Sequence, residues 1–299
     1  MEQSGLTVYA VPGQNGLGSS PEYIRALLQA DKNFPIEIIS VSTPGFGKDL
    51  GQNNCIKALA DSIQKLKRTH QHAIIHATSQ GTATAINYLA HTKDTNPENK
   101  IDGLVLEATL ASGNSAVHHT FSNPFMGIPL LARIPFSYYW LPYAVKAFIP
   151  FYWPGGKQPI KSIEKLPNNL PIVIAHSRSD IRFSFNDACA LYYGLRKKGN
   201  DNVYLLPFDG RKHIEVIGES GGHAAQVLRA ILTKHSLLQK EQNIDLSRLQ
   251  PDPNQFKAHY DALVAREKWH NRIKYLLSAG ACTATAFAIK ALCSKYGIC

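Results

Sequence analysis

Cysteine and acidic residues are scarce in this 299-residue sequence. The five cysteines, an odd number, do not suggest a disulfide framework, and no Cys-x-x-Cys pair or Cys/His cluster has the spacing of metal ligands. Low-complexity segments and repeats of fixed period are also lacking, which excludes a disordered chain, a solenoid and a propeller. We therefore expect one large domain with a modest appendage, and neither a metal nor a cofactor.

The shortage of acidic residues, 22 against 32 lysines and arginines, gives a formal net charge of +10. Half of this excess lies in the tail from Phe256 onward, where seven basic residues stand against two acidic ones, a net of +5. A basic balance can indicate nucleic acid, an anionic membrane surface or solubility alone. Because the sequence has no helix-turn-helix, zinc-finger or aromatic RNA-binding signature, we expect no nucleic-acid partner.

The N-terminus lacks the pattern of a secretion signal. No basic residues followed by an apolar stretch occur in the opening Met-Glu-Gln-Ser-Gly. Together with the cysteine usage, which suits a reducing compartment, this leads us to expect a cytoplasmic main domain.

Short apolar runs alternate with helical patterns along the first 240 residues. Six runs are typical of strands: residues 6–11, 36–41, 72–77, 101–106, 172–175 and 203–206. Apolar residues at helical spacing follow several of them, for example in residues 54–68, 186–197 and 222–233. This alternation predicts an α/β fold with a mostly parallel sheet flanked by helices. The chemistry of such sheets lies at the carboxyl ends of the strands.

Ser79 directly follows the third run and opens a helix, within His-Ala-Thr-Ser-Gln-Gly-Thr. A serine on such a turn is presented to substrate, and the amides of the helix N-terminus point at an incoming oxyanion. The turn needs small residues on either side, which Ala77 and Gly81 supply, although Ala77 stands where glycine is usual. The alternative interpretation is a serine that caps the helix and has no chemistry.

Asp180 and His213 follow the fifth and sixth runs, so the chain order is Ser, Asp, His. A nucleophilic serine needs a base to accept its proton and an acid to orient that base. Glu107, at the end of the fourth run, is a rival for the acid, and His223 is a rival for the base. We favour His213 because His223 falls at the start of the last helix, one element too late.

The segment from about Leu6 to Thr233 resembles the α/β-hydrolase superfamily, nearest in layout to its lipase, esterase and serine-aminopeptidase-like branches. The resemblance rests on four further turns: Val11-Pro12-Gly13-Gln14, Thr43-Pro44-Gly45-Phe46-Gly47, His176-Ser177-Arg178-Ser179-Asp180 and Asp209-Gly210-Arg211-Lys212-His213. It favours Asp180 over Glu107, and it implies that the backbone amides of Gln14 and Gln80 are the oxyanion donors. Proline at position 12, where the family has histidine, leaves an inactive site as an alternative.

Two regions interrupt the alternation. Within the expected hydrolase domain of residues 1–240, residues 110–169 form an aromatic-rich insertion where the superfamily carries its lid. The sequence predicts a linker and helical tail for residues 241–299. Within this tail, residues 275–293 are weakly apolar and lie near basic residues, Trp269 and cysteines. Membrane association through this tail and a soluble helix packed on the main domain are both open.

These features together predict a serine hydrolase that cleaves a carboxylic ester or thioester. An apolar lid favours a lipid-like or acyl substrate. Ser79 would attack, His213 would carry the proton, and Asp180 would orient His213. The alternatives are an amide or peptide hydrolase and a catalytically inactive binding or scaffold protein at a membrane.

Overall fold

The structure is a computed structural model, and it describes residues 3–13, 16, 18–29, 33–42, 52–65, 70–92, 96–124, 129–148, 157–210, 213–219, 222–238 and 244–273. Three features of the sequence analysis lie outside the described residues. These are Gln14, the whole turn at residues 43–47, and the apolar segment 275–293.

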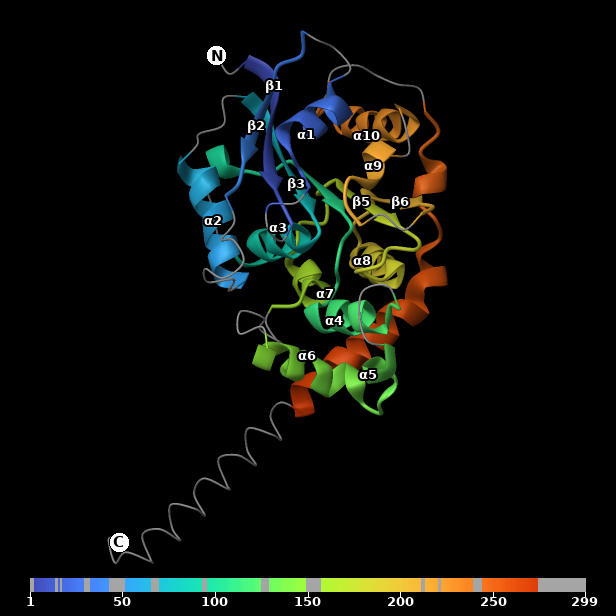
Figure 1. The fold of residues 1–299 in the computed structure, drawn as a ribbon. Coiled ribbons are helices and arrows are strands. Elements are labelled where there is room, and N and C mark those ends of the chain that lie inside the picture. Colours follow the sequence, from blue (N-terminus) through green and yellow to red (C-terminus); the bar gives the residue numbers. More distant parts are fainter. Residues whose placement is uncertain are drawn as a thin grey trace, which may run out of the picture.

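A six-stranded parallel sheet forms the centre of the molecule (Figure 1). Its strands are β1 (Gln3–Val11), β2 (Ile36–Ser40), β3 (His70–Thr78), β4 (Gly103–Glu107), β5 (Ile172–Ser177) and β6 (Val203–Phe208), in the order β2-β1-β3-β4-β5-β6. Each strand contains one of the six predicted apolar runs or most of it, so the prediction of a mostly parallel α/β sheet is confirmed. Strands β4 and β5 are buried along their whole length, as expected of a sheet covered on both faces.

Helices cover both faces because alternate strand residues point to opposite sides of the sheet. Helices α2 (Gln52–Lys65), α3 (Gln80–His91) and α8 (Phe185–Lys197) contribute to one apolar cluster. Helices α1 (Pro21–Leu28), α9 (Val216–Glu219) and α10 (Gly222–Lys234) contribute to the other. Within β3, Ile75 belongs to the first cluster and Ile74 to the second, so this central strand connects the two cores.

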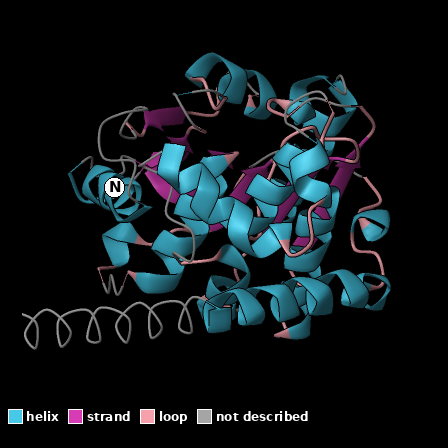
Figure 2. Cartoon of the chain, turned by 60° about the horizontal axis from the view of Figure 1, so that its bottom comes forward, coloured by secondary structure: helices cyan, strands magenta, loops and turns pink. Residues whose placement is uncertain are grey.

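The insertion between β4 and β5 is helical. It contains α4 (Gly113–Ser122), α5 (Pro129–Arg133), α6 (Ser137–Phe148) and α7 (Pro159–Ser162). Short 3₁₀ turns lie at Pro97–Asn99, Ile163–Lys165, Ser247–Leu249 and Pro253–Phe256. Helices α4, α5 and α6 gather at one end of the molecule in Figure 1, and Figure 2 turns that end toward the viewer.

Residues 257–273 form a further helix, here called the C-terminal helix, that runs alongside the insertion. Its buried residues recur every three or four positions: Tyr260, Leu263, Glu267 and His270. This spacing is that of a helix with one face packed on the body of the molecule. Among the helices that the structure describes, none combines the length and the apolar character needed to cross a membrane.

Candidate active site

Ser79 occupies a strained turn between β3 and α3. Its backbone has φ 54° and ψ −122°, a combination that costs a non-glycine residue about 1–3 kcal/mol. The turn is held by hydrogen bonds from Ser79 N to Glu107 O (2.9 Å) and from Thr82 N to Ser79 O (3.0 Å). Ser79 holds the N-cap position of α3, but its hydroxyl makes no capping hydrogen bond to the described residues of that helix. Strain maintained at a polar side chain is typical of functional sites.

Gly81 explains why this turn needs a small residue after the serine. A Cβ on Gly81 would lie 2.4 Å from Val11 O and 2.6 Å from Pro12 O, closer than any carbon can approach a carbonyl oxygen. The first turn of α3 therefore packs directly on the end of β1. Ala77, on the other side of Ser79, is fully buried and faces the first apolar cluster.

A chain of hydrogen bonds joins the three predicted catalytic side chains. The Oγ atom of Ser79 lies 2.8 Å from Nε2 of His213. The Nδ1 atom of His213 lies 2.8 Å from Oδ2 and 3.0 Å from Oδ1 of Asp180. A carboxylate can only accept, so His213 donates from Nδ1, and its Nε2 is left as the acceptor for the Ser79 hydroxyl.

The loop after β5 holds the Asp180 carboxylate in its ionised form. Oδ1 of Asp180 accepts from the amides of Arg182 (2.7 Å) and Phe183 (3.0 Å). Burial alone would raise the pKa of the Asp180 carboxyl, but the hydrogen bond and charge of His213 outweigh it, so the pKa falls below its ordinary value. An ionised Asp180 is what the orienting role requires.

His176, four residues before Asp180, is a buried neutral neighbour of the acid. Burial lowers the pKa of the His176 imidazole to about 4, although the charge of Asp180 opposes that shift. Nε2 of His176 lies 3.2 Å from the carbonyl oxygen of Phe183 and 3.7 Å from Oδ2 of Asp180. His176 therefore braces the loop without adding a second charge to it.

The loop carrying His213 is tied to the loop carrying Asp180. Arg178 N donates to Phe208 O (2.7 Å), and Ser179 N donates to Gly210 O (3.2 Å). Gly210 has φ 121°, a conformation that suits glycine, which explains the glycine of this motif. The ring of Phe183 meets the His213 ring edge to face at 4.7 Å, which restricts the imidazole further.

Glu107, the rival acid, forms hydrogen bonds with Tyr23 and His76. Its carboxylate accepts from the Tyr23 hydroxyl at both oxygens (2.9 and 3.0 Å) and lies 3.0 Å from Nε2 of His76. On the other side of the His76 ring, Nδ1 lies 3.2 Å from Ser19 Oγ, which in turn lies 2.6 Å from Thr78 Oγ1. Ser19, His76 and Glu107 resemble a second triad, but all three are almost completely buried. They connect the turn before α1 to the residue preceding Ser79.

Sequence reasoning missed this buried network, although one signal was present. His76 directly follows the apolar residues Ala73–Ile75 in the buried part of β3, and a buried imidazole needs polar partners. Burial and the charge of Glu107 raise the pKa of Tyr23, whose hydroxyl also accepts from the amide of Gly218 (3.2 Å). The network therefore reaches from the turn before α1 to Gly218 in α9.

Three further histidines lie outside the relay. His223 is exposed at the second position of α10. The histidines of α4 are half-buried and have no place in the predicted relay. His119 Nε2 lies 3.0 Å from the carbonyl oxygen of Asp180, and His118 Nε2 lies 3.2 Å from Ser137 Oγ. The insertion thus contacts the loop that carries the acid.

Of the two predicted oxyanion donors, Gln80 lies within the described residues. Gln80 is the first residue of α3, directly after Ser79, where helix amides are free to bind a ligand. Gln14 lies outside the described residues. Among the residues that the structure describes, no cluster of three or more His, Cys, Asp or Glu side chains could hold a metal ion.

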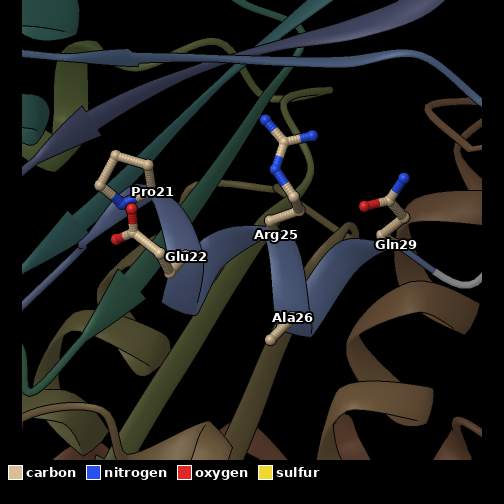
Figure 3. Close-up of a pocket in the computed structure, with 5 residues that line it drawn as sticks. All are labelled: Pro21, Glu22, Arg25, Ala26 and Gln29. Carbon is tan, nitrogen blue, oxygen red and sulfur yellow. The ribbon is translucent and has the colours of Figure 1, made fainter.

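A hollow of about 500 Å³ on the outer face of α1 is separate from this site (Figure 3). It is lined by Pro21, Glu22, Arg25, Ala26 and Gln29. Ser79, Asp180 and His213 are not among its lining residues, so this hollow is not part of the candidate site.

The fold of this chain is similar to that of several solved structures. Acylaminoacyl peptidase from Pyrococcus horikoshii aligns with 83% of this chain at 14% identity and a TM-score of 0.53, and this chain covers 39% of that enzyme. An esterase from Pyrococcus furiosus aligns with 78% of this chain and 83% of its own length, at 16% identity and a TM-score of 0.53. A propionate-bound esterase from Thermogutta terrifontis aligns over 80% and 86% respectively, at 14% identity and a TM-score of 0.52.

These similarities are structural. The sequence matches no protein-family model and no curated protein sequence. The chain spans about two fifths of the length of the acylaminoacyl peptidase, and most of the length of the two esterases. The strand order, the turn at Ser79 and these matches together show an α/β-hydrolase fold, which confirms the fold predicted from the sequence.

Proposed function

We propose that this protein is a serine hydrolase in which Ser79 is the nucleophile, His213 the general base and Asp180 the residue that orients the base. The observation that carries the proposal is the unbroken relay of 2.8 Å contacts from Ser79 Oγ to His213 and from His213 to Asp180. The three residues come from separate loops that are far apart in the sequence. Burial of Asp180 and the strain at Ser79 support a catalytic role over a structural one.

The relay supports acyl transfer in two steps. Ser79 Oγ would attack a carbonyl carbon while its proton passes to Nε2 of His213. Backbone amides of Gln80 and Gln14 would bind the resulting oxyanion. The bond to the leaving group would then break as that group takes the proton from His213. Water, deprotonated by His213, would release the acid from Ser79 and restore the hydroxyl.

For the substrate we propose a carboxylic ester or thioester with a lipid-like acyl group. The insertion contributes aromatic side chains, and its helix α4 contacts the loop of Asp180. An apolar cover beside a nucleophile suits an acyl chain. Of the three solved structures described above, two are esterases and one is a peptidase, so an amide bond is the alternative for the same relay.

The test is covalent labelling with a fluorophosphonate, which reacts with activated serines. We expect labelling of the full chain, loss of labelling in Ser79→Ala, and unchanged labelling in Ser247→Ala, which removes an exposed serine outside the site. Asp180→Asn should lower kcat about 10⁴-fold, because the amide favours the wrong His213 tautomer. Folded protein that is not labelled would leave an inactive scaffold as the function.

Substrate class needs a separate measurement. We expect kcat/KM for p-nitrophenyl esters to rise with acyl chain length and to exceed that for the matching anilides. Turnover of acetyl esters alone would contradict the lipid-like substrate, and preference for anilides would favour the peptidase alternative.

A further inference from the structure

Four large apolar side chains are exposed within the described residues, and all four lie at one end of the molecule. They are Leu130 (71% exposed), Ile134 (42%) and Phe136 (77%) in or after α5, and Trp269 (53%) in the C-terminal helix. Exposed apolar side chains gathered in one region are typical of interaction sites, whereas scattered ones need no explanation. We call these four residues, with the exposed Arg133, Lys268 and Arg272, the tip surface.

The two parts of the tip surface are joined by direct contacts. The hydroxyl of Tyr138, two residues after Phe136, donates to Oε1 of Glu267 (2.8 Å), two residues before Trp269. The guanidinium of Arg266 lies over the Tyr138 ring at 5.4 Å. Figure 1 shows the C-terminal helix beside α5 and α6 at this end. The tip surface is therefore made by elements that hold one another in place.

Phe136 is presented in a conformation that its own side chain disfavours. Its φ is 61°, in the left-handed region, where non-glycine residues are strained. The carbonyl oxygen of Phe136 accepts from Tyr139 N at 2.8 Å, so this residue starts α6 with its ring outside the packed core. Neither the backbone nor the core of the fold gains from a phenylalanine here. An external partner for the ring would explain why it is present.

The exposed charge of the tip surface has one sign. Residues 129–140 contain no acidic residue, and the one acidic residue in 262–273 is Glu267, which is fully buried. Arg272 lies over the Trp269 ring at 5.2 Å, so a cation and an aromatic ring face solvent together. Aromatic rings beside basic side chains match the boundary between lipid headgroups and acyl chains.

We propose that the tip surface docks on an anionic lipid bilayer. Leu130, Ile134, Phe136 and Trp269 enter the interfacial region, and Arg133, Lys268 and Arg272 contact the headgroups. Charge complementarity selects a bilayer over an apolar protein groove, because each basic side chain gains from the negative potential of the membrane. The docking is independent of the catalytic relay, since none of these residues belongs to it.

Vesicle co-sedimentation of the full chain tests the proposal. We expect binding to vesicles of phosphatidylcholine and phosphatidylserine that exceeds binding to phosphatidylcholine alone and falls as salt rises. Arg133→Gln with Lys268→Gln should lower binding about fivefold for each charge removed. Lys57→Gln with Lys65→Gln, which removes two exposed lysines of α2, is the charge-matched control and should bind like the wild type.

The variant Phe136→Gly distinguishes a loss of vesicle binding from a loss of folding. Glycine accepts the positive φ, so this variant should be at least as heat-stable as the wild type, yet its vesicle binding should fall about tenfold through loss of the ring. Trp269→Ala should also weaken binding. Fluorophosphonate labelling in solution should be unchanged in both variants, so failure here is distinguishable from failure of the proposed hydrolase activity.

Three results would overturn the proposal. The first is wild-type protein that does not bind the anionic vesicles. The second is equal binding by the wild type and the tip-surface variants, which would assign any membrane affinity to residues after Ile273. The third is equal binding to both vesicle compositions. Dimerisation that is lost in Phe136→Gly, without vesicle binding, would instead identify a second copy of the chain as the partner.

Discussion

Asp180 and Asp187 lie seven residues apart, yet their carboxyl pKa values shift in opposite directions. The Asp180 carboxylate accepts hydrogen bonds from His213 and from two backbone amides, and its pKa falls despite its burial. Asp187, near the start of α8, accepts from Ser115 Oγ (2.8 Å) and Ala111 N (3.1 Å), and burial raises its pKa to about 6. The difference follows from the partners: a histidine that can carry charge stabilises a carboxylate more than a hydroxyl does.

The raised pKa of Asp187 predicts a stability that depends on pH. The folded state disfavours the ionised carboxyl, so Asp187 costs stability above about pH 6, and this cost disappears as the pH falls toward the unfolded value of 3.8. Compared with Asp187→Asn, the wild type should therefore gain up to about 3 kcal/mol on going from neutral to acid pH. Urea denaturation of both proteins across this range measures the difference. A difference that does not change with pH would contradict the assignment.

At the scale of elements, the geometry of the candidate active site depends on how closely α3 approaches β1. The backbone oxygens of Val11 and Pro12 fill the space that a side chain at position 81 would need. The same packing aims the N-terminus of α3 at the place where the oxyanion would form. Close packing of this kind leaves no room for adjustment, because interiors are as dense as crystals of small molecules.

Gly81→Ala should therefore be costly. We expect a loss of about 3 kcal/mol or more in unfolding free energy, since the new methyl overlaps backbone atoms that cannot rotate away, together with loss of fluorophosphonate labelling. Gly222→Ala is the matched control, because a Cβ there meets nothing within 4 Å at the start of α10. Its stability, measured by thermal unfolding, should equal or slightly exceed that of the wild type.

At the scale of the whole molecule, one buried carboxylate connects the C-terminal helix to the insertion. Glu267 is fully buried and accepts from Ser112 Oγ, from Asn114 Nδ2 (3.2 and 3.1 Å) and from Tyr138 OH (2.8 Å). Ser112 also caps α4 by accepting from two backbone amides. Burial and the charge of Glu267 raise the pKa of Tyr138, which keeps its hydroxyl a donor. The C-terminal helix is therefore part of the folded body.

Glu267→Ala should remove about 3–5 kcal/mol of stability, because it leaves three buried donor side chains without their acceptor. Glu267→Gln should cost much less. Its amide could donate to the Asn114 Oδ1 atom, which has no partner among the described residues, once the Asn114 amide turns over. Guanidinium chloride unfolding distinguishes the two variants, and equal losses would show that hydrogen bonding at Glu267 is not what holds the helix.

Much of the architecture was predictable from local sequence. Apolar runs such as residues 172–175 are buried strands because β-branched side chains fit a sheet covered on both faces. The order Ser79, Asp180, His213 with its turn glycines was sufficient to predict the relay, since parallel strands bring their carboxyl ends to one edge of the sheet. The roles of Glu107 and Glu267 were not predictable, because their partners lie up to 155 residues away in the sequence.

The sequence by itself determined the alternation of strands and helices and the chemical types at the strand ends, because both depend on short-range periodicity and turn chemistry. The sequence favoured Asp180 over Glu107 and His213 over His223, but only the tertiary structure shows which of these side chains hydrogen-bond to one another and to Ser79. That choice depends on which side chains reach His213 and Ser79 in space, to within a few tenths of an ångström. The tertiary structure alone also placed Phe136 and Trp269 on the outside, since exposure is a property of the packed molecule.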